Sequence, residues 1–417
     1  MFFKKNVMRK NLLIPSRTAG HSFIWCMLVA VLATCSLVSC KEEEQHGYLE
    51  HDTTPPEAVS NVQVEPLPGA ADISYSLPEN SLDLLYVKAR YEIRPGVKQE
   101  ASTSFYGTSI LVAGFGDTAE HKVELVSVDR SGNMSEPVEV NVKPKYPPVQ
   151  QVYDSLTYAA DFGGIRIISG NPSKADLMVG VLIKDSLGDW VDYDRTYSAL
   201  REINFTSRGL PAELTSFGVY VRDRWHNYSD TLIQDLVPLF EEQLDPNNFQ
   251  ALALPGDDET NTWSIPGLWD NNPGGHNGVR SSNGTPSHYQ FSIVRPGQKA
   301  KISRFKIWGI FDGREYTSAN IKDFEVWGSD APASDGSFDG WTLMGTFEIK
   351  KPSGLPSGQL SNDDKSMAAA GFEFDMPFEA PAVRYIRINV LSTFASPPNS
   401  ETGDIWMTEV AFWGQLE

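Results

Sequence analysis

Cysteine is nearly absent from this chain of 417 residues. Its three cysteines, Cys26, Cys35 and Cys40, all lie within the first forty positions. Beyond Cys40 there is no thiol for nucleophilic catalysis, no thiolate ligand for a metal and no disulfide. Stability must therefore come from burial of apolar side chains, and a chain of this length can bury several cores.

Positive charge is scarce as well. The sequence holds 35 Lys and Arg against 54 Asp and Glu, a formal net charge of −19. Five basic residues fall within the first 17 positions, so 35 less 5, or 30, face all 54 acidic residues in the remainder. Acidic surfaces repel phosphate backbones, and the sequence has no Lys/Arg cluster that could form a basic binding surface. We therefore expect no nucleic-acid partner. A neutral ligand experiences no such repulsion.

Acidic residues are missing from positions 1–40, where basic residues precede an apolar run from Phe23 to Val38. This order is typical of a secretory signal, and the run is too short for a confident membrane span of about 20 residues. It ends in Leu37-Val38-Ser39-Cys40, which resembles the bacterial lipobox. The resemblance implies that residues 1–39 are a signal peptide and that Cys40 is lipidated. An ordinary signal peptide with an incidental cysteine is the alternative.

The polar segment that follows Cys40 has no apolar residues to bury, so we expect residues 40–51 to form an anchor and a flexible linker. The acidic stretch from Lys41 to Gly47 resembles the export tag of Bacteroidetes surface lipoproteins. This resemblance implies a lipid-anchored protein of the outer membrane that faces the cell exterior, with the lipid as its one membrane contact.

An internal repeat sets the predicted domain plan. The Pro55-Pro56 and Pro147-Pro148 pairs lie 92 residues apart, and Asp129-Arg130 and Asp223-Arg224 lie 94 residues apart. Units of this length match sandwich domains, which predicts modules at 52–144 and 145–249. The Asp-Arg motifs are rich in turn-forming Asp, Gly and Asn, so we interpret them as hairpin turns and not as catalytic sites.

Strand patterns run through the chain. Val87, Ala89, Tyr91 and Ile93 alternate with charged residues, and Val219 and Val221 behave likewise. The stretch from Leu232 to Asn248 is interpreted as a hinge with a helical turn. Residues 250–417 contain seven of the ten tryptophans, alternating segments such as 384–390 and 408–413, and Gly- and Pro-rich loops at 271–286 and 352–366. We expect an all-β module there, without a helix of useful length.

Each predicted module resembles a known domain family. The first resembles a fibronectin type III domain through Asp52-Thr53-Thr54-Pro55-Pro56 and the motif from Asp129 to Asn133, and the second resembles it more distantly. Residues 250–417 resemble the discoidin or coagulation-factor type C branch of galactose-binding-like domains, through the motifs at 268–271, 322–329, 383–388 and 408–414. The implied fold class is all-β: two tandem immunoglobulin/fibronectin-like sandwiches followed by a galactose-binding-like jelly roll. The disulfide that often closes type C domains is impossible here.

As a whole, the chain resembles Bacteroidetes surface lipoproteins of SusC/SusD-type glycan-utilisation systems. The resemblance implies a non-catalytic protein that binds glycan for polysaccharide capture, with SusC/SusD-type proteins of the outer membrane as partners. The alternative is a protein-interaction scaffold that docks on a transporter or an enzyme of the envelope, since fold alone does not assign function.

Glycan recognition needs aromatic faces for the apolar C–H side of a sugar and polar side chains for its hydroxyls. Loops between the predicted strands supply both, and the candidates are His276, Asn277, Arg280, Phe311, Asp312, Arg314 and Phe394, with His288 and Tyr316 beside them. Each could instead be an ordinary solvated loop residue. Trp308 and Trp327 lie within strands, so we expect them to pack inside the fold.

The type C resemblance also implies a structural calcium held by Asp270 and Glu409. Calcium takes six to eight oxygen ligands, so two carboxylates plus carbonyl oxygens are compatible with it. Asp270 as the cap of a turn is the alternative, and zinc has neither cysteines nor paired histidines to bind it.

Catalysis is not expected. The adjacent acids Asp257-Asp258 and Asp363-Asp364 lie in polar stretches and are predicted to face water. Glycoside hydrolysis requires two carboxyl groups about 5–10 Å apart across a cleft. No nucleophile elbow, phosphate-binding loop or metalloprotease helix is present in the sequence.

Overall fold

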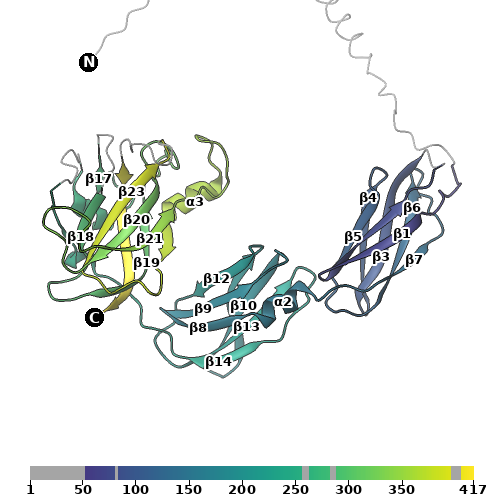
Figure 1. Cartoon of the computed structure of the whole chain (residues 1–417), viewed down its shortest axis with the longest axis horizontal. Helices are drawn as coiled ribbons and strands as arrows, with labels where there is room; N and C mark the ends of the chain where they lie inside the picture. The colour runs from purple at the N-terminus through teal and green to yellow at the C-terminus, as the bar shows by residue number, and fades with distance from the viewer. Residues whose placement is uncertain (1–51, 80–82, 256–262, 282–287, 396–404) are drawn as a thin grey trace, which may run out of the picture.

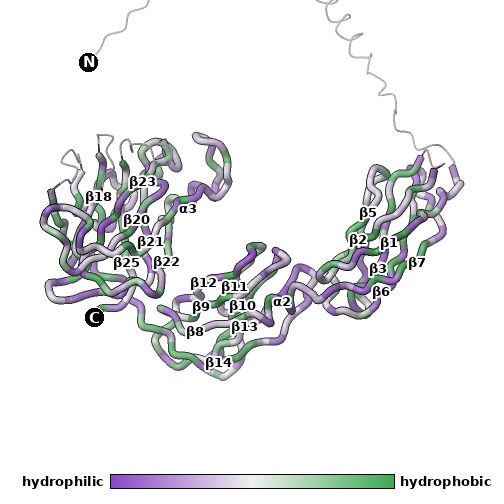
Figure 2. Tube along the Cα trace, viewed as in Figure 1, coloured by the Kyte–Doolittle hydropathy of each residue, from purple (hydrophilic) through white to green (hydrophobic). Residues whose placement is uncertain are grey.

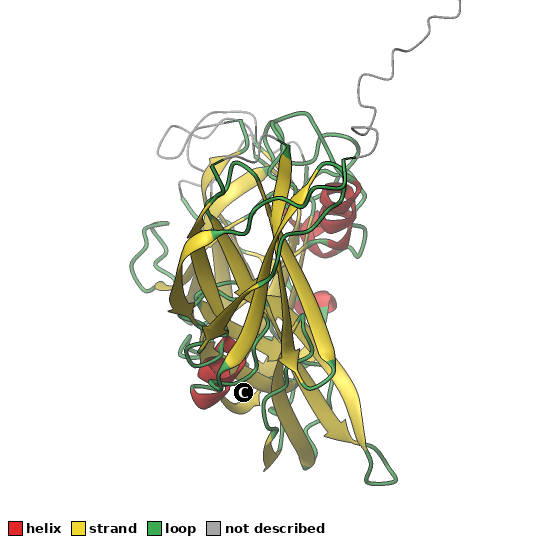
Figure 3. Ribbon diagram, turned by 90° about the vertical axis from the view of Figure 1, so that its right-hand side faces the viewer, coloured by secondary structure: helices red, strands yellow, loops and turns green. Residues whose placement is uncertain are grey.

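The computed structural model describes residues 52–417 apart from 80–82, 256–262, 282–287 and 396–404. The described residues form three β-rich modules that follow one another in sequence order, with the first and third at opposite ends (Figure 1). Strands dominate and short helices lie at the margins (Figure 3). None of the described helices has the length and apolarity needed to cross a membrane. The signal peptide, Cys40 and the linker lie outside the described residues.

The first module packs a sheet of order β1-β2-β5 against one of order β4-β3-β6-β7. The predicted alternation is confirmed, since Val87, Ala89, Tyr91 and Ile93 on β3 all point into the core. Apolar segments run through its strands, as they do in the other modules (Figure 2). Its strands are β1 (Ser60–Leu67), β2 (Ala70–Ser76), β3 (Leu84–Arg94), β4 (Val97–Ser104), β5 (Ser109–Ala113), β6 (His121–Asp129) and β7 (Val138–Val142).

The second module packs a sheet of order β12-β9-β8 against one of order β11-β10-β13-β14, and Val219 and Val221 lie in its core. The predicted hinge is wrong in its first part. Residues Leu232–Leu236 form β14, which pairs with β13, because Leu232 and Leu236 pack against the module core. Its elements are α2 (Pro148–Asp154), β8 (Thr157–Asp161), β9 (Gly164–Gly170), β10 (Leu177–Lys184), β11 (Trp190–Ser198), β12 (Glu202–Ser207), β13 (Thr215–Asp223) and β14.

The third module packs a sheet of order β15-β25-β19-β22 against one of order β16-β18-β23-β20-β21, so the predicted all-β class of sandwiched sheets is confirmed. Its first strand pairs with β25, and Leu244 and Phe249 join its core, although its predicted start is residue 250. Its strands are β15 (Glu242–Gln243), β16 (Gln250–Ala251), β17 (Val279–Arg280), β18 (His288–Ser292), β19 (Ala300–Trp308), β20 (Ile321–Ser329), β21 (Thr342–Glu348), β22 (Phe372–Asp375), β23 (Tyr385–Thr393), β24 (Trp406–Met407) and β25 (Glu409–Leu416). Short 3₁₀ helices occupy Pro246–Asn248 and Ile265–Trp269.

The repeated Asp-Arg motifs form the same turn in both sandwiches. The Asp129 carboxylate accepts hydrogen bonds from the backbone and side-chain nitrogens of Asn133, at 2.8 and 2.9 Å. Asp223 accepts the matching pair from Asn227, at 2.9 and 2.8 Å. Each carboxylate is thus occupied by its own turn, as expected for a structural motif.

The second turn also forms the joint with the first module. Trp225 packs against the first module's core and lies over Gly114, where a Cβ atom would approach its ring to 2.9 Å. Asn227 donates to the Gly114 carbonyl at 2.9 Å, and Arg94 donates to the Trp225 carbonyl at 2.9 Å. The joint therefore combines ring packing with directional hydrogen bonds.

A charged network forms the second joint. Glu241 precedes β15, and its carboxylate accepts hydrogen bonds from Ser303 at 2.5 Å and Arg304 at 3.1 Å, both on β19. Arg208 of the second module lies 3.8 Å from Glu241 and pairs with Asp375 of the third module at 2.9 Å. Glu241, Arg208 and Arg304 are largely buried, so removing Glu241 would leave the two cations uncompensated, whereas Asp375 is about half exposed.

One predicted loop is a helix. Residues Asn362–Ala370 form α3, whose first turn is closed by a capping box between Ser361 and Asp364. The prediction that Asp364 faces water is wrong, because its buried carboxylate also accepts hydrogen bonds from Ser353 at 2.9 and 2.6 Å. Although burial opposes ionisation, the hydrogen bonds from Ser353 and Ser361 lower the pKa of Asp364 to about 2.

The Asp364 carboxylate should stabilise the protein in a defined pH range. Its pKa is lowered from 3.8 to about 2, so its contribution is present above pH 3.8 and is lost as pH falls through 2. We expect Asp364→Asn to lower the melting temperature by several degrees at pH 7, with a gap that closes between pH 4 and pH 2. Thermal melts followed by circular dichroism test this, with Asp363→Asn as the control; equal melting of the two variants at pH 7 would contradict it.

The first joint should loosen when its ring is removed. Trp225→Ser places at this turn the residue that Ser131 supplies in the first module. We expect small-angle X-ray scattering of the mature chain to show a broader distribution of interatomic distances, because the ring packing on Gly114 is lost. Ser131→Ala is the matched control and should leave the profile unchanged. An unchanged profile for Trp225→Ser would show that the ring does not fix the joint.

Candidate functional site

Three loops meet at one end of the third module around a hollow of about 80 Å³. The hydroxyl of Thr408, which precedes β25, lies 3.0 Å from the Pro273 carbonyl and 3.1 Å from the Gly309 carbonyl. It thereby joins the loop after Ile265–Trp269 to the loop after β19. The hollow is lined by Pro273, Gly274, Gly275, His276, Ile310, Phe311, Asp312 and Thr408.

Polar groups form one wall of this hollow. Arg314 donates two hydrogen bonds to the Asp312 carboxylate, at 2.8 and 2.5 Å. The Nε2 atom of His276 lies 3.3 Å from the same carboxylate. The hydrogen bonds from Arg314 lower the pKa of Asp312, so this group is an ionised acceptor at neutral pH. All three side chains are about half exposed and accessible to a ligand.

Two tryptophans extend the site. The rings of Trp263 and His276 are stacked with centroids 5.9 Å apart. Trp406 forms a small apolar cluster with Ile310, Ala319 and Trp263, separate from the main core. Arg280 lies 6.0 Å from both tryptophan rings, and Arg314 lies 5.0 Å from the Trp406 ring. Such cation–ring contacts hold the aromatic surface in place.

The sequence did not single out Trp263 or Trp406. Their available signal was weak: both are tryptophans outside the long alternating segments, next to loops that carry other candidates. Their importance depends on a contact between segments more than one hundred residues apart, which local patterns do not report.

The structure brings some of the predicted glycan-binding residues together and separates others. His276, Phe311 and Asp312 line the hollow, with Arg314 behind Asp312 and Arg280 beside the tryptophans. Arg280 lies on β17 and not in a loop. The remaining candidates lie elsewhere: Asn277 donates to Asp270 at 2.7 Å, Phe394 packs edge-on against the buried Tyr316, and His288 contacts Phe338.

The predicted calcium ligands are neighbours at the margin of the same loops. Glu409 is buried, and its carboxylate accepts hydrogen bonds from the backbone nitrogens of Asn271 at 3.3 Å and Asn272 at 3.1 Å. Asp270 accepts from the Asn272 nitrogen at 2.9 Å. Burial, together with the nearby Asp270, raises the pKa of Glu409 to about 8 against the effect of these hydrogen bonds. Two hard oxygen donors in close contact fit a divalent cation.

The alternative role predicted for Asp270 was to cap a turn, and its hydrogen bond from the Asn272 nitrogen does so. The cap and the proposed calcium ligand are therefore the same carboxylate. The Trp308 and Trp327 rings are half-buried in their strands, and their indole nitrogens donate to Ala369 and Glu325.

The acid pair Asp257-Asp258 lies outside the described residues.

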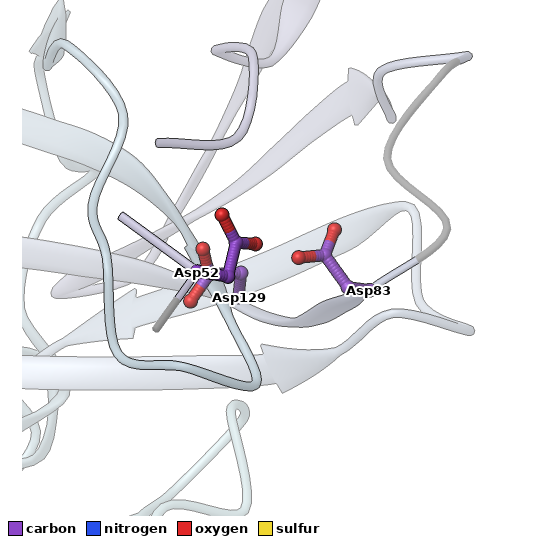
Figure 4. Close-up of side chains that lie close together, drawn as sticks. All are labelled: Asp52, Asp83 and Asp129. Atoms are coloured by element: carbon purple, nitrogen blue, oxygen red, sulfur yellow. The ribbon is translucent and has the colours of Figure 1, made fainter. Parts of the chain in front are cut away.

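A separate acidic group lies at the far end of the first module. Asp52, Asp83 and Asp129 come within 4.8 Å of one another, and Figure 4 shows the three carboxylates. Asp129 is committed to the turn with Asn133, whose side chain also donates to the Asp52 carbonyl at 3.0 Å. The group therefore fastens the start of the module to its closing turn.

Three domain families match consecutive parts of the chain, and all three are described as domains of unknown function. They are DUF4959 over residues 56–144, DUF5126 over 145–247 and DUF5000 over 269–414. No protein with curated function matches the chain significantly.

Among solved structures, the chain is similar to "SusE-like protein BT2857", with 33% sequence identity over 65% of this chain and 100% of that chain, at a TM-score of 0.41. A two-domain fibronectin type III segment of chicken tenascin matches at 12% identity over 43% of this chain and 99% of that chain, with a TM-score of 0.21. The FN1–FN3 domains of chicken CNTN1 match at 11% identity over 85% and 99%, with a TM-score of 0.19.

The superpositions on the chicken proteins are too poor to support any conclusion. The relation to the first structure rests on sequence identity over the whole of its chain. This chain belongs to the family of SusE-like proteins.

Proposed function

We propose that this protein is a non-catalytic, cell-surface lipoprotein that captures polysaccharide, with the third module as its binding module. The observation that carries the proposal is the meeting of Phe311, His276, Asp312 and two tryptophans at one end of that module. Aromatic faces beside hydrogen-bonding side chains are the combination that sugars require.

The size of the hollow limits how a sugar would bind. Pockets that enclose small molecules measure roughly 300–1,000 Å³, whereas this hollow measures about 80 Å³. A glycan would therefore lie across the loops with one edge in the hollow. Hydroxyl groups would bond to His276 and Asp312, and the apolar side of the sugar would rest against the ring of Phe311. An open site of this kind suits a polymer chain.

The rest of the chain would position this site. Lipidation of Cys40 would hold the protein at the outer membrane facing outward, and the two sandwiches would carry the third module away from the anchor. The ring packing at Trp225 and the charged network at Glu241 support a stalk with defined joints. The SusE-like family membership supports SusC/SusD-type outer-membrane proteins as partners.

We also propose that Asp270 and Glu409 are two ligands of a structural calcium ion, with loop carbonyl oxygens completing its shell. A bound cation would offset the repulsion between these carboxylates and hold Glu409 in its ionised form. It would fix the loop from Asp270 to Asn277, which carries His276 into the hollow. Calcium is thus proposed as a support for the glycan site and not as a reactant.

Truncation of Phe311 should weaken binding. A stacked ring contributes about 0.5–1.5 kcal/mol beyond its buried area, so Phe311→Ala should cost roughly tenfold in affinity. Affinity electrophoresis of the mature chain in gels containing neutral polysaccharides measures this loss. Leu355→Ala, which removes an exposed apolar side chain from a segment that does not line the hollow, is the control. Equal retardation of both variants would contradict the proposed site.

Calcium should raise the melting temperature. At about 100 times the dissociation constant a ligand stabilises by ~2.7 kcal/mol, which corresponds to a shift of about 5–10 °C for a domain of this size. We expect differential scanning calorimetry to show this shift between 2 mM calcium and EDTA. Glu409→Gln should abolish it, and Glu348→Gln, at an exposed carboxylate, should not. Identical melting of the unmodified chain in calcium and EDTA would exclude the site.

A further inference from the structure

The second module carries an aromatic face that neither the proposed site nor the module core uses. On β10 and β13, Val179, Val181, Val219 and Val221 point into the core, so the alternate residues form the outer face of the sheet. The outer residues of the four strands include Trp190, Tyr197, Tyr220 and Tyr228, the last beyond the end of β13. We call these four rings the aromatic platform.

A glycine allows one platform ring to lie close to the sheet, and a second glycine lies beside another ring. A Cβ atom at Gly180 would come within 2.5 Å of the Tyr220 ring, which occupies the space above this position. At Gly218 a Cβ atom would lie 3.4 Å from the Trp190 ring. A side chain at Gly180 would lift the Tyr220 ring from the backbone, whereas the contact at Gly218 is an ordinary van der Waals distance.

Two of the rings stack, and the other two lie on the same face of the sheet. Tyr220 and Tyr228 are stacked with centroids 6.0 Å apart, and Arg222 lies 5.9 Å from the Tyr228 ring. Arg222 pairs across the sheet with Met178, which in turn pairs with Tyr197 on the other side. The exposed fractions are 37% for Trp190, 66% for Tyr197 and 52% for Tyr228, so the ring surfaces are open to solvent.

Polar groups border each ring. Asp192 lies 3.3 Å from the Tyr220 hydroxyl and is held by Arg195 at 2.7 Å, and Lys184 lies 5.3 Å from the Trp190 ring. The charged groups beside the rings are Asp192, Arg195, Lys184 and Arg222, so this face does not share the negative balance of a chain whose net charge is −19. A protein–protein interface of stable size has a core depleted of charged residues, whereas here every ring has a charged neighbour. The face matches a neutral ligand that has apolar faces and hydroxyl edges.

We propose that the aromatic platform of the second module is a second binding site for neutral polysaccharide. This inference deepens the proposed function and rests on it. A single long glycan chain can then contact both the platform and the end of the third module. Two linked sites raise the apparent affinity for a polymer by about 10²–10⁴-fold over either site alone when the geometry permits both contacts.

The test uses the full mature chain in affinity gels that contain amylopectin, galactomannan, xyloglucan, glucomannan or yeast mannan. The platform variant is Trp190→Ala with Tyr228→Ala, and the loop variant is Trp263→Ala with Phe311→Ala. Tyr106→Ala, at an exposed ring of the first module, is the control. If the platform variant does not fold, Tyr197→Ala with Tyr228→Ala replaces it, because both rings are more than half exposed.

We expect each variant to lose at least tenfold in apparent affinity for the retarding polymer and the combined variant to lose retardation. For a tetrasaccharide of that polymer, titration calorimetry should give two sites in the unmodified chain and one in the platform variant. Unchanged retardation of the platform variant, with loss in the loop variant, overturns the platform and leaves the proposed function intact. The reverse result overturns the loop site and leaves the platform.

Two other outcomes are decisive. No retardation of the folded, unmodified chain in any of the five gels overturns both sites as binders of neutral polysaccharide. A platform variant whose one defect is loss of a copurifying envelope protein assigns this face to protein docking and overturns the inference.

Discussion

The turn from Asp223 to Asn227 is the contact on which the arrangement of this protein most depends. The Asp223 carboxylate holds Asn227 within the turn, and Asn227 donates to the Gly114 carbonyl of the first module. The turn presents Trp225 to the first module and leads directly into Tyr228 on the outer sheet face. One local motif thus fixes a joint between modules and places a ring of the platform. Its counterpart at Asp129 has Ser131 in place of the tryptophan and holds the start of the first module instead.

The third module separates stability from recognition. Its main core is built from the inner faces of two sheets, and the small cluster around Trp406 lies apart from it, above the strand ends. Loops there can vary in sequence at little cost to the core, which is why binding residues concentrate on loops positioned by a rigid scaffold. The Thr408 hydroxyl ties two of these loops together. Its position next to Glu409 couples the hollow to the proposed cation site.

Strand alternation made much of the fold predictable. The pattern at Val87, Ala89, Tyr91 and Ile93 reports burial of one sheet face, and the structure confirms it. Alternation does not predict burial where both faces of a strand are covered. Arg387 is fully buried between Phe338 and Trp341, at 4.7 and 4.4 Å from their rings. The helix α3 was missed because its stability depends on the buried Asp364 and not on an apolar stripe. Strand β14 was missed because its partner, β13, decides its conformation.

The candidate site was predictable only in part. His276, Phe311 and Asp312 were found because polar and aromatic residues in loops of a β-module are natural candidates, and the structure places all three around one hollow. Trp263 and Trp406 were not found, and Phe394 was included although it packs against Tyr316. Loop residues have no period, so their side-chain directions follow from long-range contacts that one sequence does not contain.

The central claim is that sugar rings contact aromatic side chains at the loop end of the third module. A crystal structure of the mature protein with an oligosaccharide taken from a polymer that it binds tests this claim most directly. The account predicts a sugar ring against Phe311 with hydroxyl groups within hydrogen-bonding distance of His276 or Asp312. Sugar bound elsewhere on the protein, with this end bare, would contradict it.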